Sequence, residues 1–529
     1  MFFQSDVEPS YFLKHHPPAK NLSILMISIS MSNNYNNAGI DLVTGYLREE
    51  GYSVDVCYYH KNESYDHIRN HISYGYDIYG FTVFPTNIKI IQKLSGDIKE
   101  NNEQATIILG GTYATLFHED LFNDDPHIDY ICLGDGEEPM SDFLASYERY
   151  GLNIPECALP VSIVPRISTQ NKRPNVRSED YYHQITDYYD NDSLEANLLK
   201  THCILTKNNI CLGACSFCTS RKGKVVFRDV DDIIAEIEWI HGQFGVTKFY
   251  FVDDNLFDPK TLLAKIRIER LCEKIINLPY NLQLEGLIKA DVVTNEKSDT
   301  RLLELMNEAG FTSLFVGIES FNHHDLILYN KKTTVAQNIS TVSLLHKNRI
   351  YPKMGFIMYN PYSTVERLRK NYETLLWLKA TNLHHYTLSI LQIYKYTKIY
   401  RRVKQDRLLK PGYSIYSNME YYYIDRQVKE IVDFLSYEFY YDYDMIHLFK
   451  LQEYFYFAVR KDPRLIALEC ELNALIDNHM DLYQWFFDAV FVHVDIEKAK
   501  SMLPAFNDRL DSFQSDLYKL KQRISEKRI

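Results

Sequence analysis

Short apolar runs alternate with longer segments of helical periodicity along the first third of the chain. The run at 22–30 is mostly apolar, which is typical of a strand buried on both faces. A helix is predicted at 39–50, and further strands at 54–59, 78–84, 106–109 and 130–133. This alternation predicts a parallel sheet covered by helices, a Rossmann-like α/β domain over residues 20–150.

The next segment interrupts this pattern. Residues 151–197 contain four prolines, followed by many Tyr, Asp and Asn residues. Such a composition is typical of an irregular connection. We therefore interpret residues 151–197 as a linker.

Strand–helix alternation resumes over residues 198–400. Strands are predicted at 202–206, 248–253, 281–287, 313–318, 353–359 and 384–393, and helices at 230–244, 259–276, 300–309, 335–347 and 364–379. This series predicts a second α/β domain. In α/β barrels the chemistry takes place at the carboxyl ends of the strands.

Residues 401–529 have a different pattern, in which apolar residues follow helical spacing. One series runs from Ile424 through Val428, Ile431 and Leu435, and another from Phe506 through Leu510, Phe513 and Leu517. This predicts a C-terminal helical domain. Tyr and Phe crowd into this region. They could form a lid that recognises substrate, but we favour packing between helices.

Composition limits the classes of function. The chain has 529 residues, of which 46% are hydrophobic and 24% are charged, as in globular proteins. Its net charge of −12 argues against a broad nucleic-acid-binding face. No signal-peptide-like start or bilayer-length apolar stretch occurs, and six of the nine cysteines are scattered. We expect a soluble, cytoplasmic protein without structural disulfides, membrane or nucleic acid as partner.

The other three cysteines form the most distinctive motif. Cys211, Cys215 and Cys218 follow the spacing C-x3-C-x2-C directly after a predicted strand. Thiolates this close repel one another unless a cation or cluster lies between them, and soft thiolate ligands suit iron–sulfur clusters or zinc. A cluster usually takes four cysteines, so three would leave one iron open to another ligand. A zinc site completed by His202, Cys203 or a distant residue is the alternative.

At these residues the sequence resembles the radical S-adenosylmethionine (SAM) enzymes, in which an aromatic residue such as Phe217 precedes the third cysteine. The resemblance implies a [4Fe-4S] cluster on Cys211, Cys215 and Cys218, and SAM chelated to the open iron. It also implies reductive cleavage of SAM to a 5′-deoxyadenosyl radical. Residues 198–400 would form the family's partial (β/α)6 barrel, which has too many strand–helix units for a zinc knuckle.

Several strand ends resemble the SAM-binding elements of this family. Asp253 and Asp254 stand where the family accepts the SAM amino group, although they could instead cap the turn before Pro259. Val316-Gly-Ile-Glu-Ser320 resembles the fourth-strand element; Glu319 could alternatively pair with Lys289. Tyr362 departs from the family, which often has Gly there. The implied SAM contacts are Phe217, Asp253, Asp254, Glu285, Lys289, Gly317, Glu319 and Ser320.

The N-terminal domain resembles the cobalamin-binding domain of one branch of the family. The resemblance rests on Ile108–Thr112 and Leu133–Glu138, where paired glycines allow a ligand close to the backbone. The implied cobalamin contacts are Thr82, Gly110, Gly111, Thr112, Gly134 and Glu137. The D-x-H-x-x-G motif that supplies a lower axial histidine is absent, since no glycine follows His127 at that spacing. A structural domain that has kept the fold without cobalamin is the alternative.

The resemblance implies cobalamin-dependent methylation of an unactivated centre in a peptide or natural-product intermediate. A flavodoxin or ferredoxin would supply electrons, and S-adenosylhomocysteine would form besides 5′-deoxyadenosine. One alternative is a cobalamin-independent maturase that catalyses cyclisation, cross-linking, epimerisation or rearrangement. Another is a zinc-stabilised, non-catalytic binding protein. A methylthiotransferase is disfavoured, since the first domain has too few cysteines for a second cluster.

Overall fold

The computed structural model describes residues 21–30, 37–60, 65–66, 69, 75–151, 200–208, 210–220, 223–258, 260–381, 383–412, 420–438 and 446–526. The chain divides into two compact units. Unit 1 is Met1–Ile210, Thr219–Val252 and Ser414–Asn418; unit 2 is Cys211–Cys218, Asp253–Tyr413 and Met419–Ile529. Apart from Gly151, the predicted linker 151–197 lies outside the described residues. The domain boundaries near 198 and 400 stay predictions.

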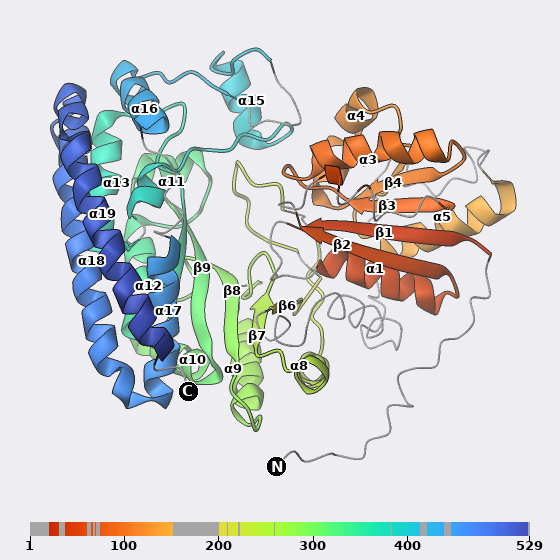
Figure 1. The fold of residues 1–529 in the computed structure, drawn as a ribbon, viewed down its shortest axis with the longest axis horizontal. Coiled ribbons are helices and arrows are strands. Elements are labelled where there is room, and N and C mark those ends of the chain that lie inside the picture. Colours follow the sequence, from red (N-terminus) through yellow and green to blue (C-terminus); the bar gives the residue numbers. More distant parts are fainter. Residues whose placement is uncertain are drawn as a thin grey trace. The chain divides into compact units, whose positions relative to one another are not determined.

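Unit 1 contains the predicted N-terminal sheet (Figure 1). Its strands are β1 (Ser23–Ser30), β2 (Ser53–His60), β3 (Ile78–Thr82), β4 (Thr106–Gly110) and β5 (Tyr130–Ile131). All pair in parallel, in the order β2-β1-β3-β4-β5. The predicted Rossmann-like architecture is therefore confirmed, with strand ends within a few residues of those expected.

Helices connect these strands, as parallel pairing requires. They are α1 (Ala38–Glu49), α3 (Ile88–Asn101), α4 (Thr112–Asp124) and α5 (Glu137–Tyr150). The apolar stripes of α1 and α5 pack on the sheet, where Ile40, Leu47 and Leu144 join Ile24 and Ile78 in one core. Parallel pairing brings the carboxyl ends of the strands to one edge, where ligands of such sheets bind.

Unit 1 also contains a second parallel pair, β6 (Thr201–Ile204) and β7 (Lys248–Phe251), connected through α8 (Val230–Phe244). His202, on β6, is fully buried, and its Nε2 lies 3.0 Å from Oε1 of Glu236. Arg228 Nη1 lies 2.8 Å from the other oxygen of that carboxylate. His202 therefore serves a buried ion-pair network, which argues against a zinc site completed by its ring.

In unit 2 the strands β8 (Gln283–Lys289), β9 (Phe311–Glu319) and β10 (Tyr351–Phe356) pair in parallel. The helices before, between and after them are α9 (Leu262–Ile276), α10 (Glu296–Ala309), α11 (His323–Leu328), α12 (Val335–Lys347) and α13 (Val365–Trp377). They follow the predicted alternation closely, with α11 as an additional short helix.

The strand predicted at 384–393 is wrong over its first half. Residues Leu383–Thr387 form the short helix α14. The segment after it pairs with the chain just beyond β10: Ile390 forms a parallel bridge to Tyr359, and the Leu391 N–H donates to the Tyr359 carbonyl at 2.8 Å. Leu383, His384, Tyr386 and Thr387 are all buried. The buried residues are three and four positions apart, a spacing that lies on one face of a helix. A short apolar segment of this kind can be mistaken for a strand, whose buried residues alternate.

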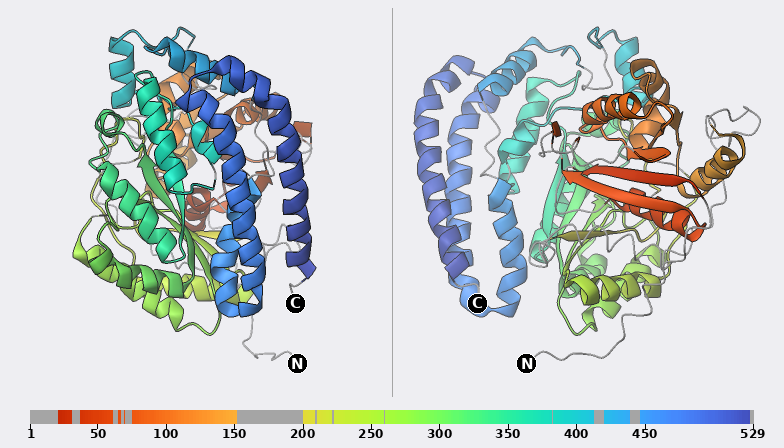
Figure 2. Two further views of the ribbon diagram at one scale, coloured as in Figure 1. Left: turned by 90° about the vertical axis from the view of Figure 1, so that its left-hand side faces the viewer. Right: turned by 45° about the vertical axis from the view of Figure 1, so that its right-hand side comes forward.

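The predicted C-terminal helices also lie in unit 2. They are α15 (Lys398–Gln405), α16 (Arg426–Glu438), α17 (Ile446–Lys461), η4 (Pro463–Leu465), α18 (Ile466–Phe487), η5 (Asp488–Val492) and α19 (Ile496–Glu526). The long helices α18 and α19 run side by side (Figure 2). Tyr483, Phe486, Phe487 and Phe506 are at most 2% exposed. These aromatic residues form a helical core, as favoured. No helix among the described residues has the length and apolar content to cross a bilayer.

Two buried histidines lie within this helical core. The ring of His479 on α18 packs at a tilt against Tyr483 and Phe513, at ring-centroid distances of 4.4 and 5.1 Å, and meets His384 edge to face at 6.5 Å. Neither ring nitrogen of His479 has a hydrogen-bond partner in the described structure. Burial, and secondarily the neighbouring His384, lowers the pKa of His479 to about 3. The folded protein therefore holds this ring neutral.

We expect His479→Phe to reduce the acid sensitivity of folding. In wild type, His479 of the unfolded chain binds a proton below about pH 6.5, whereas His479 of the folded protein stays neutral. The free energy of unfolding therefore falls by ~1.4 kcal/mol per pH unit as the pH drops from about 6.5 toward the pKa of the folded state. Urea unfolding between pH 7 and 4 measures this slope, with His493→Phe at an exposed position as the control. An unchanged slope in His479→Phe would contradict this account.

Candidate functional site

The cysteine motif forms a loop within unit 2. Cys211 is buried, and Cys215 and Cys218 are half-buried. The Gly213 N–H donates to Sγ of Cys211 at 3.3 Å. A Cβ on Gly213 would approach that sulfur at 3.2 Å and the Lys289 side chain at 3.9 Å. Glycine therefore lets the loop fold closely around its first thiol.

Ser216, between the second and third cysteines, anchors this loop to two other segments. Its N–H donates to the Tyr329 carbonyl and its hydroxyl to the Leu328 carbonyl, both at 2.8 Å. Its own carbonyl accepts from the Ile399 N–H on α15 at 2.9 Å. Ser216 is 7% exposed. All three of its polar groups are thus engaged away from water.

The segment after α11 adds two further contacts to the loop. Asn330 has φ +52°, a left-handed conformation that asparagine tolerates, and its Nδ2 donates to the Ala214 carbonyl at 2.7 Å. The rings of Phe217 and Tyr329 meet edge to face at 5.6 Å. Phe217, predicted from the motif, therefore packs against the segment that holds the loop.

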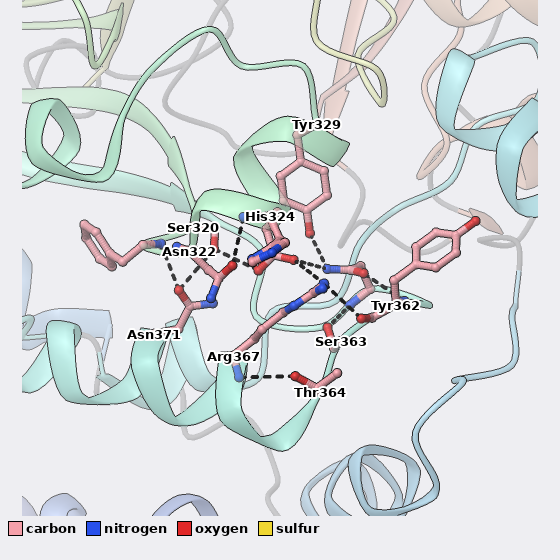
Figure 3. A network of polar contacts seen from close by, with 12 residues as sticks. Ser320, Asn322, His324, Tyr329, Tyr362, Ser363, Thr364, Arg367 and Asn371 are labelled. Atoms are coloured by element: carbon pink, nitrogen blue, oxygen red, sulfur yellow. Dashed lines mark hydrogen bonds and ion pairs between the residues drawn. The ribbon is translucent and has the colours of Figure 1, made fainter.

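A buried polar network braces Tyr329 (Figure 3). Nδ2 of Asn360 donates to the Tyr329 hydroxyl at 2.9 Å and to Asp325 at 3.2 Å. The Ser320 hydroxyl lies 3.1 Å from Asp325 and from Asn371. Burial raises the pKa of Asp325, although its hydrogen bonds oppose this. Ser320 thus orders the end of β9, and its predicted contact with SAM stays a prediction.

The segment after β7 supports the loop from another side. Oδ2 of Asp258 accepts from the Leu212 N–H at 2.7 Å, directly beside Cys211. Asn255 donates to Oδ1 of the same carboxylate at 2.7 Å and accepts from the Lys289 N–H at 3.2 Å. Both side chains are buried. One relay therefore connects the cysteine loop with the carboxyl end of β8.

The two aspartates predicted to bind the SAM amino group lie in that segment. Asp253 is fully buried and Asp254 is half-buried. The cap of α9 is Thr261, whose side chain accepts from the Ala264 N–H, so neither aspartate caps this helix. Since Asn255 and Asp258 contact the cysteine loop and β8, the structure brings this segment to the loop. The amino-group contacts stay predictions.

Glu319 forms a buried ion pair at the end of β9. Its Oε1 lies 3.1 Å from Nζ of Lys331, with side chains 12% and 3% exposed. Lys331, and not Lys289, is therefore its partner. Glu319 has φ +64°, and a Cβ on Gly317 would lie 2.8 Å from the Lys331 nitrogen. A larger residue at position 317 would therefore force the Lys331 ammonium group to shift within the ion pair.

This pair lies in the electrostatic field of the cysteines. Burial would lower the pKa of Lys331, but Glu319 and, next, Cys215 raise it overall. Burial raises the pKa of the Cys215 thiol, whereas Lys331 and Lys289 lower it. Nζ of Lys289 lies 3.6 Å from Asp291. Two lysines can thus offset negative charge on the loop, and sequence reasoning identified only Lys289.

Glu285 occupies a different position from the one expected. It is the third residue of β8, on the same face as Lys289 but about 13 Å from the strand end at ~3.3 Å per residue. Its Oε2 lies 2.7 Å from Nζ of Lys353, which also lies 2.9 Å from Glu453 on α17. Burial raises the pKa of Glu453 to about 7, although Lys353 opposes this. Glu285 thus belongs to an ion-pair triad, and its contact with SAM stays a prediction.

The cysteine loop suits an iron–sulfur cluster by its donor chemistry. Three thiols occupy eight residues, and Lys289 and Lys331 provide nearby positive charge. Among the described residues, no three His, Cys, Asp or Glu side chains already converge as a metal site. Cys211, Cys215 and Cys218 would hold the cluster. The fourth iron would be left open to SAM.

The carboxyl edge of the N-terminal sheet forms the second candidate site. Nδ2 of Asn87 donates to the carbonyls of Thr82 at 2.9 Å and Ile29 at 3.3 Å, which joins the ends of β3 and β1. The Thr115 hydroxyl donates to the Gly111 carbonyl at 2.9 Å and accepts from the Gly134 N–H at 3.0 Å. Two polar side chains that were not predicted, Asn87 and Thr115, thus order this edge.

The glycines at this edge leave the backbone open to close approach by a ligand. Gly111 has φ +93° and lies close to Thr82, and Gly134 has φ +84° with open space where a Cβ would project. His127 is not at this edge: its Nδ1 lies 2.9 Å from Oδ1 of Asp125. Two residues further along, the carboxylate of Asp129 accepts from the N–H of Ile107, near the start of β4. His127 thus lies by the opposite edge. The residues fit cobalamin held without His127 as ligand. Contacts from Gly110, Thr112 and Glu137 stay predictions.

Two protein-family models match the chain. The B12 binding domain matches residues 24–144, and the Radical SAM superfamily matches residues 205–375. The first covers the β1–β5 sheet, and the second begins before the cysteine loop and ends in α13. The two models imply cobalamin, SAM and a [4Fe-4S] cluster as cofactors.

Curated relatives are distant. An anaerobic magnesium-protoporphyrin IX monomethyl ester cyclase of Rubrivivax gelatinosus is 26% identical over 65% of this chain and 62% of its own length. A cyclase of the same name from Synechocystis is 23% identical over 49% of this chain and 51% of its own length. An uncharacterized methyltransferase of Pyrococcus horikoshii is 22% identical over 63% of this chain and 70% of its own length. The chain thus spans between half and two thirds of these cyclases.

The fold is similar to that of a solved enzyme. The cobalamin-dependent S-adenosylmethionine radical enzyme OxsB, with aqua-cobalamin and S-adenosylmethionine bound, matches with a TM-score of 0.67 and 15% identity. The match covers 95% of this chain and 81% of OxsB. A structure of apo OxsB matches with a TM-score of 0.69 and 16% identity. These matches support the predicted fold class over nearly the whole chain.

We expect Lys331→Met to destabilise the protein by ~3–5 kcal/mol, because Glu319 would remain as a buried, unpaired charge. Lys331→Met with Glu319→Gln should recover much of this loss, since the double variant buries no lone charge. Urea unfolding measures both values. Equal destabilisation in the single and double variants would mean that the ion pair has no role in stability.

Asn330→Ala should shorten the lifetime of a reconstituted cluster. The variant loses the bond to Ala214 and places alanine in a left-handed conformation, a cost of about 1–2 kcal/mol. Asn330→Gly relieves only the backbone strain and is the matched control. Iron release to a chelator, followed by absorbance, should be faster in both variants and fastest in Asn330→Ala. Release at the wild-type rate in both would show that Asn330 does not hold the loop.

Proposed function

Because this chain belongs to the radical SAM superfamily and has an N-terminal B12-binding domain, we propose that it methylates an unactivated carbon of a small molecule or peptide. The proposal rests on one observation: the same chain contains a candidate cluster site and a candidate cobalamin site. One is the cysteine loop held beside Lys289 and Lys331. The other is the glycine edge of the β1–β5 sheet.

The bound cofactors would supply an adenosyl radical and a methyl group, which are the demanding parts of this chemistry. The task of the chain is then to bind, orient and exclude water. Ser216 and Asp258 hold the loop from two sides. Asp253 and Asp254 are the proposed acceptors for the SAM ammonium group, since charge-assisted hydrogen bonds are strong. Lys289 is suited to a carboxylate.

Ring closure on a small molecule is the second candidate. It is favoured by the cyclase relatives, each of which is named as an anaerobic magnesium-protoporphyrin IX monomethyl ester cyclase. The relative named as a methyltransferase is uncharacterized and slightly less similar. Ring closure would use the same cysteine loop, but it requires no transfer of a methyl group to the product.

Product analysis with SAM as the only probe separates the candidates. The protein is reconstituted anaerobically with iron, sulfide and hydroxocobalamin, and then reduced with dithionite. Methyl transfer predicts bound corrinoid and S-adenosylhomocysteine besides 5′-deoxyadenosine, and Cys215→Ala should abolish 5′-deoxyadenosine. Protein that forms only 5′-deoxyadenosine and no S-adenosylhomocysteine, with or without bound corrinoid, would contradict methylation and favour ring closure. No SAM cleavage at all would overturn both.

A further inference from the structure

A concentration of basic residues lies on and around α15. Residues 395–410 contain seven lysines and arginines against one aspartate, in a chain whose net charge is −12. Five of them are exposed and form what we call the α15 basic face: Lys398, Arg401, Arg402, Lys404 and Arg407. The single acid, Asp406, accepts from the Tyr362 hydroxyl at 2.6 Å. The surface therefore presents a positive patch that is unusual for this chain.

The opposite side of α15 is fixed to the cysteine loop. Ile399 and Val403 are at most 1% exposed and share an apolar cluster with Tyr329 and Phe217. The Ile399 N–H donates to the Ser216 carbonyl at 2.9 Å. Ser216 lies between Cys215 and Cys218, so one hydrogen bond separates α15 from the backbone of the predicted cluster ligands.

We propose that the α15 basic face is the docking surface for a small acidic electron-transfer protein that carries a reduced flavin. This inference rests on the proposed function, in which a donor must deliver one electron to the cluster. The donor loses one electron, the oxidised cluster gains it, and no bond forms or breaks between the proteins. Complementary charge at this place would speed encounter and orient the donor toward the loop.

Charge and size favour such a partner over a polyanion. An eight-residue helix is about 12 Å long, which suits a compact protein contact better than a nucleic-acid track. The chain as a whole is acidic, which opposes wrapping by a long polyanion. Because α15 contacts the cysteine loop, a partner bound to the α15 basic face would lie near the predicted cluster, as electron transfer requires.

Two double variants with equal charge change test the docking surface. Arg401→Glu with Lys404→Glu reverses the α15 basic face, and Lys498→Glu with Lys519→Glu reverses two exposed lysines on α19. Arg401→Lys with Lys404→Arg preserves the charge. Flavodoxin hydroquinone is the acidic flavin probe. Its dissociation constant is measured anaerobically against the reconstituted full chain at ~50 and ~300 mM salt.

We expect wild type to bind flavodoxin more weakly at high salt, and the α15 reversal to weaken binding at least about tenfold at low salt. The α19 and charge-preserving variants should stay within about twofold of wild type. Equal affinity in wild type and the α15 reversal would overturn the proposal. So would an equal loss in both reversals, or binding of an oligonucleotide or anionic vesicles to the α15 basic face without any binding of flavodoxin.

A kinetic arm separates this inference from the proposed function. With dithionite as reductant, the α15 reversal should form 5′-deoxyadenosine at the wild-type rate, because a small reductant needs no docking surface. With flavodoxin hydroquinone its rate should fall about tenfold or more. Equal rates with flavodoxin would overturn the docking proposal. Failure of wild type with dithionite would overturn the proposed function, while the binding titration still tests the docking surface.

Discussion

The candidate site depends above all on how Ser216 is held. The cysteine loop has no regular secondary structure of its own, so its shape must come from contacts with other segments. Ser216 provides them through its N–H, hydroxyl and carbonyl, which reach the end of α11 and the start of α15. Because these groups are buried, breaking one bond would leave an unsatisfied partner at a cost of about 1–3 kcal/mol. The shape of the loop is therefore determined by the chain's own contacts.

Around this loop, buried charged side chains form ion pairs. Lys331 and Glu319 neutralise each other within the strand ends, and Gly317 leaves the room that they require. Lys353 joins β8, β10 and α17 through Glu285 and Glu453. Buried ion pairs of this kind add little net stability, yet losing one partner is costly. Their main effect is to hold the strand ends, and the packing of α17 on the strands, in one arrangement.

Local patterns in the sequence predicted most of the fold and the central motif. Short apolar runs between segments of helical periodicity predicted β1 to β10, because the apolar pattern of a buried or half-buried strand is visible in its own few residues. The cysteine spacing predicted the loop. In contrast, Asp258, Asn330 and Lys331 were missed, since their roles depend on which segments meet in space. A left-handed residue at Asn330 has only a weak sequence signal. Glu285 was placed at a strand end because the predicted strand began and ended two residues too early.

The most direct test is the electron paramagnetic resonance spectrum of the reconstituted, dithionite-reduced protein before and after SAM is added. If three cysteines of this loop hold a [4Fe-4S] cluster with one open iron, a reduced-cluster signal should appear and its g-values should shift when SAM binds. A signal that SAM leaves unchanged, or a protein that takes up no iron while it remains folded, would contradict the account.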